Sequence, residues 1–151
     1  MKGSYILLLE LNESQWISVG RLGILLFLKG FYAYVGSALN GLESRIARHL
    51  QQGRKRHWHI DYLLDQAISY EVVLVPVERR LECTLAGALE GKLTCIYRFG
   101  SSDCRCSGHL FYAAERNELN TQVVEALANL SLTYYRHPVP APRLPPLLPE
   151  S

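Results

Sequence analysis

The sequence predicts an α+β domain in which helices flank a small, mostly antiparallel sheet. Apolar runs that suit strands come first, and two helical patterns, a further strand and two more helices follow them. This mixed order is typical of α+β domains. Glycines at 20, 23 and 30 separate the early apolar runs, which indicates strands joined by tight turns. A chain of 151 residues with 48% apolar residues suits one domain with a single substantial core.

The strands are expected where apolar and aromatic residues gather between turn-forming residues. Residues 5–9 form an unbroken apolar run, which predicts a buried strand. The runs at 16–19 and 24–28 predict an inserted β-hairpin near residues 12–29. An aromatic strand is expected over residues 31–35, ended by Gly36, and a central strand over 72–75, ended by Pro76.

Four helices are expected from the spacing of apolar residues. The first carries Leu42, Ile46 and Leu50 on one face, with Asn40 as its cap and Gly53 as its stop. The others are expected over residues 59–67, 81–89 and around 123–130, because apolar side chains recur there at helical spacing. Residues 92–113 look irregular.

These elements suggest three parts of the chain. Residues 1–113 form the main domain, and residues 114–136 supply a C-terminal helix packed on it. Six of the seven prolines follow His137. Proline lacks a backbone N–H, so residues 137–151 are expected to form a flexible, extended tail rather than a helix or an inner strand.

The charge pattern leaves two interpretations open. The net charge is only +2, but five cations and three histidines gather between residues 45 and 59. Such a cluster is either a phosphate-facing surface or an ordinary solvated face. No apolar stretch is long enough to span a bilayer and no signal peptide is visible, so a cytoplasmic protein without membrane contact is expected. In that reducing compartment the four cysteines would be thiols or metal ligands.

Several motifs resemble one nuclease family. Gly3-Ser4-Tyr5 and Tyr34-Val35-Gly36 match paired GxY and YxG signatures, and Arg45 and His49 follow at a spacing of four on the first helix. The sequence resembles the GIY-YIG nuclease superfamily over residues 3–112. The blocks at 32–38, 57–62 and 99–106 are similar to a little-characterised prokaryotic branch, found alone or fused to endonuclease III-type repair enzymes.

The resemblance implies a metal-dependent endonuclease that hydrolyses DNA phosphodiesters, with a role in repair; RNA is not excluded. It implies that Tyr5 or Tyr34 orients or deprotonates a water and that Arg45 grips the phosphate. His49 would share a proton or contact a phosphate oxygen, and Glu82 would hold Mg²⁺ or Mn²⁺. The residues expected to contact nucleic acid are Ser37, Arg48, Arg54, Lys55, Arg56, His59 and Arg105. The oligomeric state stays open.

Departures from the family pattern support an alternative function. Tyr5 and Tyr34 are far apart in sequence, and Ser37 stands where a lysine often follows the second signature. A late asparagine cannot be placed, although Asp103 is a candidate substitute. The alternative is therefore a catalytically weak or inactive nucleic-acid-binding module of the same fold.

A second site is suggested by Cys104, Cys106 and His109, three soft ligands within six residues. Thiolate and imidazole suit tetrahedral Zn²⁺, although the C-x-C spacing is tighter than usual. The candidates for a fourth ligand are Cys83, Cys95, His57 and His59. The competing interpretation is that this loop closes over the nuclease cleft. A zinc-bound regulatory or interaction domain is a third hypothesis for the function.

Overall fold

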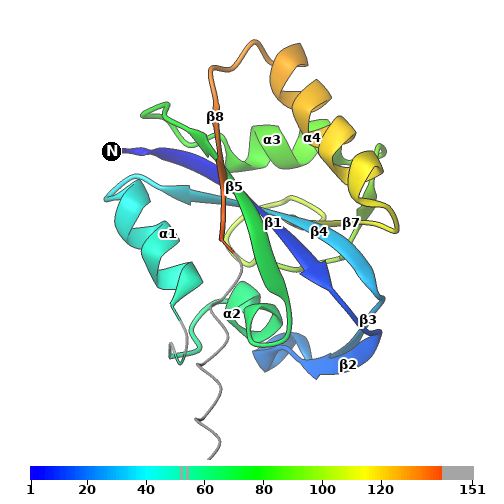
Figure 1. Cartoon of the computed structure of the whole chain (residues 1–151). Helices are drawn as coiled ribbons and strands as arrows, with labels where there is room; N and C mark the ends of the chain where they lie inside the picture. The colour runs from blue at the N-terminus through cyan, green and yellow to red at the C-terminus, as the bar shows by residue number, and fades with distance from the viewer. Residues whose placement is uncertain (52, 54, 141–151) are drawn as a thin grey trace, which may run out of the picture.

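A computed structural model describes residues 1–51, 53 and 55–140. It confirms the α+β fold class, with a six-stranded sheet in the order β6-β7-β4-β1-β5-β8 and a separate two-stranded sheet, β2-β3 (Figure 1). Every pairing between these strands is antiparallel. Among the described residues, no helix is both long and apolar enough to cross a membrane.

The elements follow one another along the chain as the sequence suggested, with three additional short strands. The strands are β1 (Gly3–Leu11), β2 (Gln15–Ser18), β3 (Ile24–Phe27), β4 (Gly30–Ala38), β5 (Ile68–Val75), β6 (Thr94–Cys95), β7 (Leu110–Ala113) and β8 (Tyr135–Pro138). The helices are the 3-10 turn η1 (Gly20–Leu22), α1 (Leu42–Leu50), α2 (His59–Leu64), α3 (Glu82–Leu89) and α4 (Arg116–Asn129).

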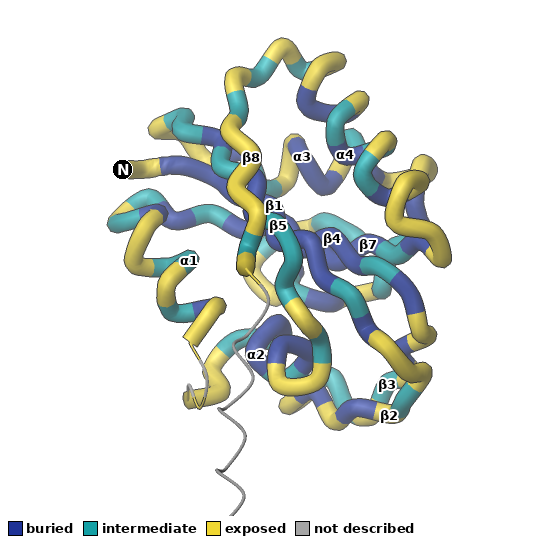
Figure 2. Tube along the Cα trace, in the orientation of Figure 1, coloured by how far each residue is buried: buried dark blue, intermediate teal, exposed yellow. Residues whose placement is uncertain are grey.

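The core lies on both faces of β1, the third strand from one edge of the sheet. Side chains alternate along a strand, so Tyr5, Leu7 and Leu9 point to one face and Ile6 and Leu8 to the other. The first face packs against α1, α2 and the hairpin, and the second against α3 and α4. Figure 2 shows the resulting buried central strands between two outer layers. This double burial explains why β1 has an unbroken apolar sequence instead of a polar alternation.

Four element boundaries differ from the predictions. Gly36 does not end its strand, because β4 continues to Ala38 and pairs with β1 along its whole length. Asn40 does not cap the first helix: α1 begins at Leu42, its N-cap is Gly41, and no side chain caps it. The helix ends at Leu50, before Gly53, and α2 ends at Leu64 instead of 67.

The irregular segment and the tail both contain strands that were not predicted. Residues 94–95 and 110–113 form β6 and β7, which extend the sheet beside β4. His137 and Pro138 are not part of a free tail, because they lie in β8 and pair with β5. Proline fits there because β8 is an edge strand, where a ladder hydrogen bond can be absent. The tail from residue 141 onward, with its remaining prolines, lies outside the described residues.

Candidate functional site

A polar cleft of about 580 Å³ opens where the start of β1, the end of β4, α1, α3 and the loop between β6 and β7 meet. Four residues that the sequence selected for phosphodiester chemistry line it together: Tyr5, Tyr34, Arg45 and Glu82. The full lining comprises Tyr5, Tyr34, Gly36, Ser37, Leu39, Asn40, Arg45, Trp58, Arg80, Glu82, Cys83, Gly100, Asp103, Cys104 and His109. Side chains from distant parts of the chain therefore share one space.

The two signature motifs meet across the β1–β4 pair. Tyr5 lies directly opposite Gly36 in the antiparallel register. A Cβ at position 36 would lie only 2.4 Å from both Cζ and Oη of Tyr5, so the phenol occupies the space that any side chain there would need. Tyr34 belongs to the same face, and its ring centroid is 6.4 Å from that of Tyr5. The glycine of the second motif is thus required by the tyrosine of the first.

His49 lies behind Tyr5 and does not line the cleft. Its Nε2 is 2.6 Å from the Tyr5 hydroxyl, and its ring is buried against the two tyrosines and Trp58. The expected contact between His49 and a phosphate oxygen is not supported by this position. Burial raises the pKa of Tyr5, although the Arg45 guanidinium counteracts it, and burial raises the pKa of Tyr34 as well. Both phenols therefore carry their protons near neutral pH.

Arg45 is held in place at the cleft by a strand and an indole ring. Its Nη1 donates to the carbonyl oxygen of Ser37 at 3.1 Å, and its Cζ lies 4.3 Å from the centroid of Trp58. Both contacts restrict a flexible side chain while leaving its charge in the cleft. The geometry is what a fixed anion-binding group requires.

Glu82 is the first residue of α3, and the helix start is anchored to β1. The Ser4 hydroxyl accepts a hydrogen bond from the Leu81 backbone N–H at 3.3 Å and lies 3.1 Å from the Ser37 hydroxyl. Ser4 is fully buried, so this contact fixes where α3 begins relative to β1 and β4. The Glu82 side chain remains 23% exposed, with an Arg80 nitrogen 3.9 Å from its carboxylate. Its oxygens can therefore reach a hydrated cation in the cleft.

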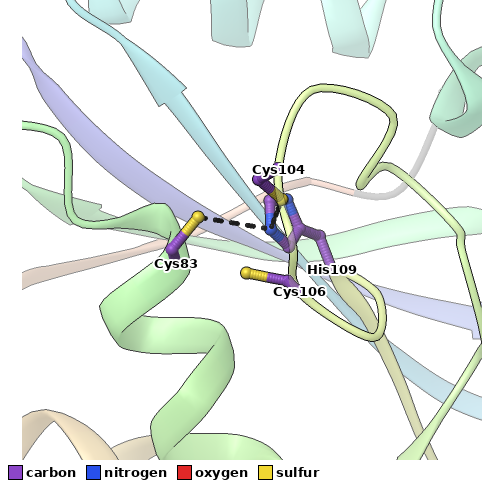
Figure 3. Close-up of side chains that lie close together, drawn as sticks. All are labelled: Cys83, Cys104, Cys106 and His109. Atoms are coloured by element: carbon purple, nitrogen blue, oxygen red, sulfur yellow. Dashed lines mark hydrogen bonds between the residues drawn. The ribbon is translucent and has the colours of Figure 1, made fainter.

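A cluster of three cysteines and one histidine borders the same cleft. The Sγ atoms of Cys83, Cys104 and Cys106 and a ring nitrogen of His109 all lie within 4.8 Å of one another. The His109 Nε2 is 3.4 Å from the Cys104 sulfur and 4.0 Å from the Cys83 sulfur. In Figure 3, Cys83 on α3 and the loop side chains point toward one another. Such a Cys₃His set could hold a metal ion such as zinc.

Two thiols of this cluster, those of Cys83 and Cys106, are not activated in the absence of a metal. Burial, together with the neighbouring thiols, raises the pKa of Cys106 to about 12. Burial likewise raises the pKa of Cys83, and it lowers the pKa of His109. Reactive cysteines have a depressed pKa, so the arrangement is unlike that of a redox or nucleophilic site.

Two of the predicted nucleic-acid-binding arginines pair with carboxylates of the chain. Arg48 donates two hydrogen bonds to the buried carboxylate of Asp61, at 3.0 and 3.1 Å, and a third to the Lys55 carbonyl. Arg56 pairs with Asp65 at 2.7 Å. Lys55 itself is exposed, and Arg54 lies outside the described residues. Arg48 and Arg56 therefore have structural partners within the chain.

A second cavity, of about 480 Å³, lies on another side of the loop that follows β6. It contains His59 and Arg105 from the predicted set and adds Arg21 and Arg98, which sequence reasoning did not select. The Nδ1 of His59 accepts a hydrogen bond from the Gly100 N–H at 2.9 Å, and burial lowers the pKa of this histidine. His59 thus supports the loop as a neutral side chain, while the arginines make this cavity cationic.

Sequence reasoning missed several residues of the main cleft. Asn40 was assigned to a helix cap, and Arg80 gave no signal at all. Ser4, which does not line the cleft but anchors the start of α3 beside it, was not selected either. The Ser4 hydroxyl could have been suspected only from its place inside the first motif. Cys83 was one of four candidates for a fourth ligand, and spacing alone did not distinguish among them.

The fold and the cleft define the class of protein: an α+β domain with a polar, charged cleft at one end of its central strands. Residues 4–132 match the family described as domain of unknown function DUF123, and the chain belongs to this family. No curated protein and no solved structure matches the chain.

Proposed function

We propose that this chain is a metal-dependent endonuclease of the GIY-YIG type that hydrolyses DNA. The observation that carries the proposal is the convergence of Tyr5, Tyr34, Arg45 and Glu82 on one cleft. These four residues come from β1, β4, α1 and α3, so their meeting is a property of the tertiary fold. Each provides a group that phosphodiester hydrolysis uses.

The pairing of the two signatures supports the resemblance to that superfamily. The close approach of the Tyr5 ring to Gly36 gives a structural reason for a tyrosine in one motif and a glycine in the other. The inserted hairpin, β2-β3, accounts for the long sequence between them. Because it forms its own sheet, it lengthens the connection without disturbing the β1–β4 register.

Tyr5 and His49 are suited to remove a proton from water. The raised pKa keeps the Tyr5 hydroxyl protonated, so it can donate to Nε2 of His49 when the histidine proton is on Nδ1. The phenol oxygen can then accept a proton from an attacking water as its own proton passes to Nε2. Tyr5 thus ends the step neutral, and the positive charge resides on His49.

Arg45 and Tyr34 are placed to contact the phosphate. The Arg45 guanidinium can hydrogen-bond two phosphoryl oxygens and stabilise the negative charge that grows in the transition state. Tyr34 can donate its hydroxyl proton to an oxygen of the same group, because its pKa also lies above the ordinary value. Since Arg45 already contacts Ser37 and Trp58, little reorganisation is needed on binding.

Glu82 is the residue that would hold a divalent cation. One partly exposed carboxylate on an open cleft fits Mg²⁺, which keeps several waters and accepts few protein ligands. A bound Mg²⁺ or Mn²⁺ would neutralise phosphate charge and assist the leaving oxygen.

The proposal is tested by incubating the full chain with supercoiled plasmid and branched DNA substrates in Mg²⁺ or Mn²⁺. Glu82→Gln is expected to reduce nicking by about 100-fold or more, because the carboxylate is the assigned cation ligand. Glu118→Gln is the matched control: Glu118 also lies in the first turn of a helix, α4, but far from the cleft lining. Equal cutting by wild type and Glu82→Gln would overturn the assignment of Glu82 as the ligand of the divalent cation.

The role of the Tyr5 hydroxyl is tested in the same nicking assay by comparing two tyrosine-to-phenylalanine variants. Tyr5→Phe should lower the rate by about 100-fold, the usual minimum for loss of a general acid–base group. Tyr112→Phe is the control, because the Tyr112 hydroxyl bonds the Lys29 carbonyl outside the cleft. Similar rates for the two variants would exclude Tyr5 as the proton acceptor.

A second candidate function is a nucleic-acid-binding module with little catalysis. One observation favours it. Ser37 stands where the GIY-YIG superfamily often has a lysine, and its hydroxyl points at Ser4 and adds no charge to the cleft. In that case DNA would bind in a salt-dependent manner, and binding would weaken in Arg45→Ala, but no divalent cation would support cutting.

A further inference from the structure

We infer that Cys83, Cys104, Cys106 and His109 bind one zinc ion, and that this ion holds α3 and the loop of residues 96–109 together beside the cleft. Tetrahedral zinc with ordinary Zn–S and Zn–N bond lengths places its ligand atoms about 3.5 to 3.8 Å apart. The measured separations from the His109 nitrogen, 3.4 and 4.0 Å, bracket that range, and no pair of ligand atoms exceeds 4.8 Å. A change of at most about 1 Å in any of these separations would complete the site.

The chemistry of the ligands favours zinc over the cation assigned to Glu82. Thiolate and imidazole are soft ligands that select zinc, whereas Mg²⁺ takes oxygen ligands. Four protein ligands also fill a tetrahedral shell and leave no position for water or substrate. The site is therefore structural, and any phosphodiester chemistry belongs to the neighbouring oxygen and nitrogen groups.

The loop that supplies three of the ligands is long and irregular. Residues 96–109 join β6 to β7 through turns and bends without a helix or strand of their own. Long irregular loops inside a compact domain are uncommon unless they have a function or a cross-link. Gly108 is packed so closely that an added Cβ would clash with the Ile96 carbonyl oxygen, which shows that the chain doubles back tightly before His109.

Cys83, the one ligand outside the loop, lies beside the cleft, so a bound ion would also position residues of the cleft. Cys83 adjoins Glu82 in the first turn of α3, while Asp103 and Gly100 of the loop line the cleft from the other side. An ion bound by Cys83 and the loop would fix both walls of the cleft and the direction of the Glu82 carboxylate. This positioning role rests on the proposed nuclease function; zinc binding itself does not.

Binding is tested on the full chain purified under reducing conditions without chelators, by elemental analysis and thermal unfolding. Wild type should contain about one zinc per chain and should melt at a lower temperature after treatment with a strong zinc chelator. Cys106→Ser should lose at least about 90% of the zinc, as expected for a structural ligand. Cys95→Ser is the matched control, because Cys95 is a partly buried thiol of the same region but is not one of the four ligands.

A metal titration covers the case in which Cys106→Ser does not fold. Chelator-treated wild type should bind one equivalent of Co²⁺ with the strong visible absorption of a tetrahedral thiolate site, and Zn²⁺ should displace it. Absence of metal uptake by the fully reduced protein, or equal zinc loss in Cys95→Ser and Cys106→Ser, would overturn the inference.

The two proposals fail in different ways. Stoichiometric zinc in a protein that nicks no DNA would refute the nuclease function and leave the zinc site intact. Nicking that survives complete zinc removal, with the same dependence on Mg²⁺, would refute the positioning role. If nicking is lost on zinc removal and returns on adding one equivalent of Zn²⁺, the positioning role is supported.

Discussion

Replacing Gly36 by alanine tests the packing on which the candidate site depends. The new Cβ would lie 2.4 Å from Cζ and Oη of Tyr5, whereas ordinary contacts begin at 3.4 Å. The Tyr5 ring is 1% exposed and has His49 only 2.6 Å from its hydroxyl, so it cannot tilt away freely. Overpacking of this kind costs about 1–3 kcal/mol. Loss of the Tyr5–His49 hydrogen bond would add about 1 kcal/mol.

The free energy of unfolding should therefore fall by about 2–4 kcal/mol, combining overpacking with a lost hydrogen bond. The assay is urea unfolding followed by tryptophan fluorescence. Gly87→Ala is the control: it lies in α3 with nothing within 4 Å of its added Cβ, and alanine there should stabilise the helix by about 0.5–1 kcal/mol. A Gly36→Ala variant within about 0.5 kcal/mol of wild type would refute the reasoning, given the usual size of neutral substitutions.

A double-mutant cycle identifies the Tyr5 ring as the cause. Tyr5→Leu removes the Cζ and Oη atoms that the alanine would meet. In that background Gly36→Ala should cost less than about 1 kcal/mol, because two contacting residues are not additive. If Gly36→Ala lowers the free energy of unfolding equally in the wild-type and Tyr5→Leu backgrounds, the strain lies elsewhere in β4.

Further predictions concern the ion pairs and the anchored helix start. Arg48→Ala should lower the free energy of unfolding by about 3 kcal/mol, because it removes the Arg48 guanidinium from the buried Asp61 carboxylate. Arg56→Ala, which breaks an exposed pair, should cost less than about 1 kcal/mol in the same urea assay. Burial alone would raise the pKa of Asp61, but hydrogen bonds from Arg48 and two backbone amides outweigh it and lower the pKa. The stabilising effect is thus present above the unfolded-state pKa, and the advantage of wild type over Asp61→Asn should shrink as the pH falls below about 4 in unfolding titrations. Ser4→Ala should reduce stability by about 1–2 kcal/mol through the unpaired Leu81 N–H; no change would mean that the hydroxyl does not anchor α3.

Elements with a clear apolar pattern or with turn-forming residues on both sides could be predicted from the sequence, whereas the short strands of the irregular segment and of the tail could not. In β1 the apolar run itself is the signal, and in α1 apolar residues recur at helical spacing over nine positions. In contrast, β6 has two residues and β7 and β8 have four, too few to show any period. Those strands exist because β4 and β5 offer free edges, which is a tertiary property.

The candidate site was predictable only through its motifs. The spacing of Arg45 and His49 on one helix could be derived, but not that one faces the cleft and the other lies behind Tyr5. Charge alone suggested that Arg48 contacts phosphate. Only the fold shows that its guanidinium donates two hydrogen bonds to the Asp61 carboxylate. Likewise, Cys83 comes next to Cys104 because α3 begins beside the loop, which no sequence spacing determines.

The anchoring of α3 to β1 through Ser4 has a consequence for how the domain becomes functional. The hydrogen bond joins residues 77 positions apart, and the groups of the cleft come from four separate segments. Forming such distant contacts is slow, since chain entropy must be lost before they contribute. An N-terminal fragment that ends before α3 could form β1, β4 and α1 without completing the cleft. Under the proposed nuclease function, a nascent chain should therefore be unable to cut nucleic acid until α3 and the loop before β7 have both been synthesised.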